Sequence, residues 1–152
     1  MAKNSEKFRE MSFMRDKLFI DSNIFVYAYI NDDMHKHVLS RNLLKDNVLV
    51  NEIVLSVQIL NEFYSVMAKY EYSHDEIKSC LGEIIEQAEI APLRLDTFKF
   101  CLFIKEKYGY SWWDSLVLAS ALENNCKIVY SEDMQHGQMI EASLKIVNPF
   151  LQ

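Results

Sequence analysis

The chain has 152 residues, a formal net charge of −6 and an isoelectric point near 5.2. Half of its residues are hydrophobic and 25% are charged, which is typical of a globular domain with a core of its own. The negative charge does not favour simple phosphate binding, so a polyanionic partner would need metal ions or a local basic patch. No apolar run approaches the roughly 20 residues that span a bilayer, and we expect a cytoplasmic protein without membrane contact.

We predict a single domain over residues 17–152, preceded by an N-terminal arm. Residues 1–16 are polar with scattered apolar positions, and we expect them to form a mobile arm outside the fold. The three cysteines, Cys80, Cys101 and Cys126, occur singly. Single cysteines favour reduced thiols over a disulfide framework or a zinc site.

Short apolar segments alternate with helical segments in the first third of the chain. Residues 17–22 are predicted to form a buried strand, and residues 24–30 to begin a helix or turn behind it. A polar helix is expected over residues 33–46, ending in a turn at 45–47. A short strand then follows within residues 48–55.

The middle of the chain carries two helix-start signals. Ser56 is predicted to cap a helix whose apolar positions recur at helical spacing and form one buried stripe: Val57, Leu60, Tyr64 and Met67. The stretch SHDE, residues 73–76, has the S-x-x-E form of a capping box. It opens a second helix that we expect to run to about residue 88.

The last third of the chain continues the alternation. Strands are predicted at residues 90–95, 127–131 and 144–147, and helices at residues 96–108 and 112–125, the first of them ended by Gly109. In the second helix one face is expected to be buried: Trp113, Leu116, Val117, Ser120 and Ala121. Strands that alternate with helices in this way indicate an α/β domain with a mostly parallel sheet.

Two acidic residues lie close behind buried strands. Asp21 follows the apolar run that ends at Ile20, and Asp133 follows the strand predicted at residues 127–131. Ligands of parallel α/β sheets bind beyond the carboxyl ends of the strands. We therefore expect both carboxylates to project into a functional crevice.

Two further acids are expected on helices near the same edge of the sheet. Glu62 lies among apolar residues in the second turn of its helix, and Asp114 lies in a first turn, where an acid also favours the helix dipole. Four carboxylates in one crevice would repel one another, and a hard divalent cation such as Mg²⁺ would relieve the repulsion. The hypothesis is metal-assisted hydrolysis of a phosphodiester. Taken singly, each acid is also explained as a solvated or capping side chain.

Four motifs together resemble the acidic motifs of PIN-domain ribonucleases: FIDSNIFVYAY, SVQILNEFYSVM, SWWDSLVLASAL and IVYSEDMQHGQ. The resemblance is greatest to the VapC-type toxins of toxin–antitoxin pairs and extends from about Lys17 to Phe150. It implies a three-layer α/β/α fold around a mostly parallel sheet. By position in the motifs, it implies four catalytic and metal-binding acids with two supporting residues: Asp21, Glu62, Asp114 and Asp133, supported by Ser131 and Asn23.

The resemblance also implies partners and a cofactor. It implies a Mg²⁺- or Mn²⁺-dependent endoribonuclease that cuts RNA, forms a homodimer and is neutralised by a cognate antitoxin protein. Two other functions stay open. A phosphoacceptor signalling domain would use one strand-end Asp, but it would also need a Lys at a later strand end, and no Lys is suitably placed. A non-catalytic scaffold would bind RNA or the antitoxin without cutting.

Overall fold

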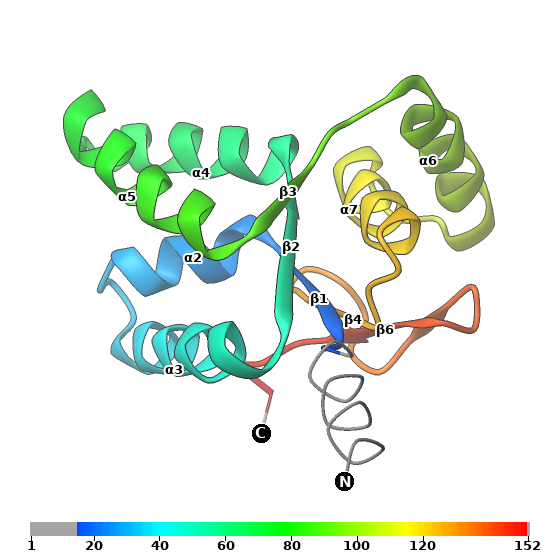
Figure 1. The fold of residues 1–152 in the computed structure, drawn as a ribbon, viewed down its shortest axis with the longest axis horizontal. Coiled ribbons are helices and arrows are strands. Elements are labelled where there is room, and N and C mark those ends of the chain that lie inside the picture. The colour runs from blue at the N-terminus through cyan, green and yellow to red at the C-terminus, as the bar shows by residue number, and fades with distance from the viewer. Residues whose placement is uncertain (1–14, 152) are drawn as a thin grey trace, which may run out of the picture.

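The computed structural model describes residues 15–151, which form a six-stranded sheet between helices (Figure 1). The strands lie in the order β3-β2-β1-β4-β6-β5, and all neighbours are parallel except β5 and β6. Their bounds are β1 (Lys17–Ile20), β2 (Glu52–Ser56), β3 (Glu89–Ala91), β4 (Ile128–Tyr130), β5 (Met139–Ile140) and β6 (Leu144–Val147). The predicted mobile arm lies outside the described residues except for its last two positions.

The helices of the described residues form the two outer layers. Their bounds are α2 (Ser22–Tyr29), α3 (Met34–Val50), α4 (Val57–Lys69), α5 (His74–Gln87), α6 (Leu95–Tyr108) and α7 (Trp112–Glu123). Helices α2 to α5 lie on one side of the sheet, and α6 and α7 pack together on the other (Figure 1). The predicted three-layer α/β/α architecture with a mostly parallel sheet is confirmed. None of the helices in residues 15–151 combines the length and apolarity that a bilayer crossing requires.

Strand β1 is the centre of the core. It pairs with β2 on one side and β4 on the other, and helices cover both faces of the sheet (Figure 1). Leu18, Phe19 and Ile20 are therefore all buried, which explains why they form a continuous apolar run rather than an alternating one. Asp21 is the first residue after this buried strand.

The two predicted helix starts have different outcomes. The capping box of α5 is confirmed, because the Ser73 hydroxyl accepts a hydrogen bond from the Glu76 N–H and the Glu76 carboxylate accepts one from the Ser73 N–H. Ser56 is the N-cap residue of α4, as predicted, but its side chain makes no capping hydrogen bond. Ser56 ends β2, and its hydroxyl is buried without a hydrogen-bond partner among the described residues.

Two element boundaries differ from those predicted. The turn expected at residues 45–47 is helical, because the Asn47 amide donates to the Leu43 carbonyl and accepts from the Asn51 amide, which keeps α3 regular to Val50. The strand expected at residues 90–95 ends after three residues. Pro92 cannot donate to a strand ladder, and α6 begins soon after it. The two-residue strand β5 was not predicted.

The buried faces of α4 and α7 also differ from the predicted stripes. Helix α4 buries Gln58, Ile59, Phe63 and Met67, whereas Val57 and Tyr64 are exposed. The polar residues of this helix share one face, and the apolar residues fill a wide arc opposite it, so their spacing does not decide which apolar positions are inside. Trp113, predicted to be buried, is 61% exposed because it lies in the first turn of α7, before the fully buried run at residues 115–121.

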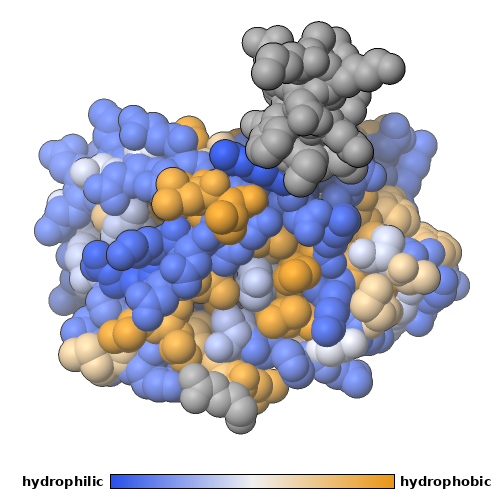
Figure 2. All heavy atoms as spheres, turned by 60° about the horizontal axis from the view of Figure 1, so that its bottom comes forward, coloured by the Kyte–Doolittle hydropathy of each residue, from blue (hydrophilic) through white to orange (hydrophobic). Residues whose placement is uncertain are grey.

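Hydrophobic side chains remain exposed mainly on α3 and α6. They include Met34, Val38, Leu49 and Val50 on α3, and Leu95, Phe98, Leu102 and Phe103 on α6. Figure 2 shows one face of the molecule, on which several hydrophobic patches are separated by hydrophilic side chains. Exposed apolar patches of this kind mark surfaces that can contact a partner.

Two glycines offer a matched test of the backbone. Gly109 ends α6 with a φ of 75°, whereas Gly82 lies inside α5, and a Cβ at either position would meet no atom within 4 Å. We expect Gly109→Ala to lower the free energy of unfolding by about 1 kcal/mol, because an L side chain is strained in the left-handed region. We expect Gly82→Ala to raise it by about 0.5–1 kcal/mol. Urea unfolding followed by circular dichroism measures both, and shifts of the same sign would contradict this account.

Candidate active site

Asp21 is fixed at the carboxyl end of the central strand. Its N–H donates to the Tyr130 carbonyl at 2.9 Å, so the pairing of β1 with β4 continues past the strand end. Its carboxylate Oδ1 accepts from the Ser22 N–H at 2.8 Å, which caps α2, and Oδ2 accepts from the Ser131 hydroxyl at 2.8 Å. Asp21 is only 4% exposed, so both oxygens are held in one orientation.

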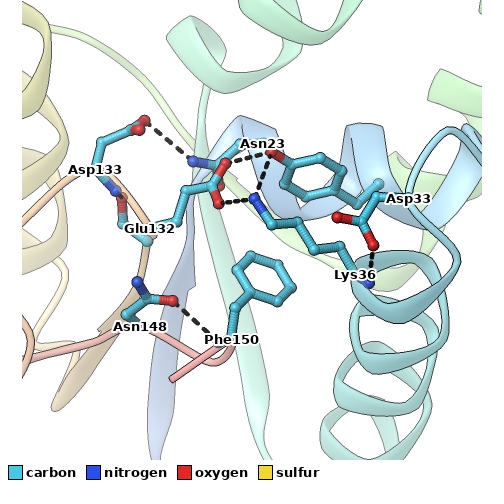
Figure 3. Close-up of polar contacts among 9 residues, drawn as sticks. Asn23, Asp33, Lys36, Glu132, Asp133, Asn148 and Phe150 are labelled. Atoms are coloured by element: carbon cyan, nitrogen blue, oxygen red, sulfur yellow. Dashed lines mark hydrogen bonds and ion pairs between the residues drawn. The ribbon is translucent and has the colours of Figure 1, made fainter. Parts of the chain in front are cut away.

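Ser131 links Asp21 to Asp133. Its hydroxyl donates to Asp21 and accepts from the Asp133 N–H at 3.2 Å, so one side chain positions both acids. The Asn23 amide, on α2, donates to Asp133 Oδ2 at 3.1 Å (Figure 3). The two residues predicted to support the site thus join α2 to the segment after β4.

Asp114 approaches the other two acids from α7. Its N–H donates at 3.1 Å to the hydroxyl of Ser111, which caps α7 and fixes its first turn. One carboxylate oxygen each of Asp21, Asp114 and Asp133 lie within 4.8 Å of one another. Three of the four predicted acids are therefore brought together in space.

Glu62 adjoins this set but does not belong to it. Its two carboxylate oxygens accept from the Ser22 hydroxyl at 2.8 Å and from the Gln58 amide at 2.7 Å. Glu62 is thereby tied to the residue next to Asp21, and any direct contact of Glu62 with a metal stays a prediction. Ser22 and Gln58 were not predicted as supporting residues. Their positions are the only signal in the sequence: Ser22 follows a strand-end acid, and Gln58 lies one helical turn before Glu62.

Burial, with a smaller contribution from neighbouring carboxylates, raises the proton affinity of the clustered acids. Burial raises the pKa of the Asp21 carboxyl from 3.8 to about 7, against the lowering effect of hydrogen bonds from Ser131 and Ser22, and the nearby carboxylates of Glu62 and Asp133 raise it further. Burial is also the main cause that raises the pKa of Asp114 and of Asp133. Three converging oxygen ligands with uncompensated repulsion fit a hard divalent cation such as Mg²⁺ or Mn²⁺.

A second polar cluster holds the segment that carries Asp133 (Figure 3). The Lys36 ammonium, on α3, lies 2.7 Å from a Glu132 carboxylate oxygen, and the Tyr27 phenol donates to the other oxygen. The ammonium also lies 4.8 Å and 5.3 Å from the ring centroids of Tyr27 and Phe150. Because Asn23 and Tyr27 are one turn apart on α2, this helix contacts the two successive acids Asp133 and Glu132.

Comparisons with known proteins identify the family. The family model of the PIN domain matches residues 18–139, which is most of the chain. The chain belongs to the PIN-domain family. No curated protein sequence matches it closely.

Solved structures with the PIN fold include VapC proteins. A toxin–antitoxin complex from Klebsiella pneumoniae has a TM-score of 0.64 at 14% sequence identity, covering 87% of this chain and 97% of that chain. VapC20 of Mycobacterium tuberculosis, described as a sarcin–ricin loop cleaving toxin, has a TM-score of 0.62 at 13% identity, covering 76% and 91%. VapBC2 of Rickettsia felis, bound to a promoter DNA fragment, has a TM-score of 0.59 at 19% identity, covering 77% and 88%. At these identities the likeness establishes the shared PIN fold.

The buried carboxyl of Asp21 makes stability depend on pH in the metal-free protein. Its pKa is about 7 in the fold and 3.8 as an isolated group, so the folded state binds the proton more tightly, and this contribution to stability is lost as pH rises from about 4 to 7. The Asn side chain in the Asp21→Asn variant cannot ionise. We expect it to raise the free energy of unfolding by on the order of 2–4 kcal/mol near pH 8 and to change it little near pH 4.

Urea unfolding in EDTA at the two pH values measures this difference. A matched control is Asp46→Asn, which removes an exposed carboxylate on α3. We expect no pH-dependent gain from the control. If Asp21→Asn destabilises the protein equally at both pH values, burial does not raise the pKa of Asp21 as described.

The cluster around Lys36 is expected to contribute more stability than a surface ion pair. Lys36→Met leaves Glu132, whose side chain is 18% exposed, without its cation, and should lower the free energy of unfolding by about 1–2 kcal/mol. Lys127→Met removes an exposed pair with Asp16 and should change it by less than about 0.5 kcal/mol. Adding Glu132→Gln to Lys36→Met should recover part of the loss. Equal, small losses for both lysines would show that the cluster is only a surface contact.

Proposed function

We propose that this PIN-domain protein is a divalent-metal-dependent endoribonuclease that acts as the cytoplasmic toxin of a toxin–antitoxin pair. The observation that carries the proposal is the convergence of Asp21, Asp114 and Asp133 to within 4.8 Å of one another at the carboxyl ends of the strands. This edge is where parallel α/β sheets bind their ligands. The PIN fold and its likeness to VapC20, described as a sarcin–ricin loop cleaving toxin, support the same activity.

In the proposed mechanism each acid has a defined support. Asp21, Asp114 and Asp133 would hold Mg²⁺ or Mn²⁺, and a bound ion supplies charge to the phosphate and acidifies water. Ser131 fixes the positions of Asp21 and Asp133 relative to each other, because its hydroxyl is hydrogen-bonded to both residues. Ser22 holds Glu62 beside the three acids, where its negative charge would favour cation binding.

Asp21, Asp114 and Asp133 form an acidic centre, which would make cleavage of RNA depend on a bound divalent cation. With a net charge of −6, the protein has no general attraction for RNA. The carboxylates would repel a phosphodiester unless a cation lies between them. A phosphoacceptor role for Asp21 is less favourable, because the side chain is buried and both of its oxygens already accept hydrogen bonds.

The groove between α2, α3 and α5 is the proposed site for the antitoxin. It has a volume of about 760 Å³ and a mixed lining that includes Tyr29, Leu44 and Val48 with Arg41 and Lys45. Leu49, at its edge, is 74% exposed, so a partner would bury apolar surface here. The Klebsiella pneumoniae relative was solved as a toxin–antitoxin complex, which supports a protein partner for this chain.

A second apolar surface suits the proposed homodimer. Leu95, Phe98 and Leu102 recur at helical spacing on α6 and are each about half exposed or more. Helix α6 lies on the opposite side of the sheet from α2, α3 and α5, whose residues line the proposed antitoxin groove (Figure 1). The two contacts would therefore not compete.

The decisive measurement is cleavage of total RNA with and without EDTA. We expect the wild-type protein to cut RNA in Mg²⁺ or Mn²⁺ and to stop in EDTA. Asp21→Asn and Asp133→Asn should each reduce the rate about 100-fold or more, because each removes a charged ligand, while Asp46→Asn should cut normally. Circular dichroism checks that the variants fold.

The outcomes separate the remaining functions. RNA binding without EDTA-sensitive cleavage would support a non-catalytic scaffold, and stable labelling by a small phosphodonor would support a phosphoacceptor. For the toxin role, expression should arrest growth, and co-expression of the protein encoded immediately upstream should relieve the arrest. Full growth with an active nuclease would contradict that role.

A further inference from the structure

A cavity adjoins the acidic centre between α4 and α7. Its volume is about 490 Å³, within the range of roughly 300–1,000 Å³ that small-molecule sites occupy. Its lining includes Asn61, Glu62 and Ser65 from α4, Leu93 from the segment before α6, and Trp113 and Leu116 from α7. Trp113 directly precedes Asp114 in the chain, so the cavity lies next to the three clustered acids.

We propose that this cavity is a nucleobase subsite in which Trp113 stacks on an unpaired base of the RNA strand, next to the phosphodiester held at the acids. The inference rests on the proposed nuclease function and adds to it a specificity-determining contact. Indole faces bind bases of single-stranded RNA by stacking, which does not require a basic surface.

Trp113 is placed unusually for its type. It is 61% exposed, although α7 is otherwise almost fully buried and the neighbouring Trp112 packs against Phe98 at 5.1 Å between ring centroids. Large aromatic side chains are mostly buried in folded proteins. An exposed indole on the residue beside a site acid therefore has a face free for a ligand.

The backbone of Trp113 is held in a fixed relation to the acids. The Gln58 amide donates at 3.3 Å to the Trp113 carbonyl and at 2.7 Å to Glu62. On the other side, the Ser111 hydroxyl accepts from the Asp114 N–H. A base stacked on the indole would thus bind beside a backbone that is fixed relative to the acids.

The chemistry of the lining favours a base over a phosphate. The lining residues include no lysine or arginine, and Glu62 adds a negative charge. A phosphate would be repelled here, whereas a neutral base is not. The exposed side chains of Asn61 and Ser65 offer donors and acceptors for a base edge beside the apolar Leu93.

Binding of single-stranded RNA separates this role from catalysis. We would measure fluorescence anisotropy of a labelled, mixed-sequence RNA of about 12 nucleotides in Mg²⁺, using the Asp21→Asn background so that the RNA stays intact. Trp113→Ala should weaken binding about 5- to 100-fold, as expected for one lost stacked base, and Trp113→Phe or Trp113→Tyr should restore most of it. Tyr70→Ala, an exposed aromatic at the far end of α4, is the matched control and should bind normally.

A cycle with abasic RNA tests the stacking itself. When the base that Trp113 contacts is removed, the RNA should bind more weakly to the protein that keeps Trp113. On that abasic RNA, Trp113→Ala should not weaken binding any further. If Trp113→Ala weakens binding equally on every abasic RNA, no single base is stacked there and the inference is wrong. If Trp113→Ala instead converts a dimer into monomers in light scattering, the indole is a subunit contact and the inference is also wrong.

Cleavage assays distinguish failure of the subsite from failure of the nuclease. An active wild-type enzyme whose KM is unchanged by Trp113→Ala would overturn the subsite and leave the nuclease standing. A wild-type protein that neither cuts nor binds RNA would overturn both. Support for the subsite is a raised KM for Trp113→Ala with the same Mg²⁺ concentration for half-maximal rate, because the metal ligands are untouched.

Discussion

The site depends on the hydrogen bond from the Ser131 hydroxyl to the buried carboxylate of Asp21. It is possible because β1 and β4 are adjacent and their pairing continues past the strand ends through the Asp21 N–H and the Tyr130 carbonyl. The same hydroxyl receives the Asp133 N–H. One buried hydroxyl thus fixes the positions of two acids from opposite ends of the chain. Helix α7 places the third acid, Asp114, beside them.

The clustered acids favour cation binding but lower the stability of the folded protein. Burial raises the pKa of Asp21 to about 7 and also raises the pKa values of Asp114 and Asp133, so the three acids resist carrying their full negative charge unless a cation is bound. Strained electrostatics of this kind are frequent at functional sites, where surrounding structure supplies the compensating stability. Here the compensation includes the apolar β1 core and the cluster in which Lys36 and Tyr27 hold Glu132.

The neighbourhood of the acids divides into chemically different parts. Toward α2 and α3, ionic and aromatic contacts bind the Asp133 segment tightly, which suits positioning. Toward α4 and α7, the Trp113 indole and neutral polar groups surround an open cavity, which suits recognition. The acidic centre lies between a cluster of polar contacts to Glu132 and Asp133 and a cavity available to a ligand.

The sequence by itself determined the architecture: alternating short strands and helices, an acid behind the buried run Leu18–Ile20, and the capping box at Ser73. These features are local, because hydrogen bonding and burial within a few residues decide them. Tertiary structure alone decided which side chains orient the acids, since Ser131 lies 110 residues from Asp21 and Ser22 lies 40 residues from Glu62 in the chain. It also decided the exposure of Trp113, because a helix buried on nearly all sides has no apolar stripe from which its faces can be read.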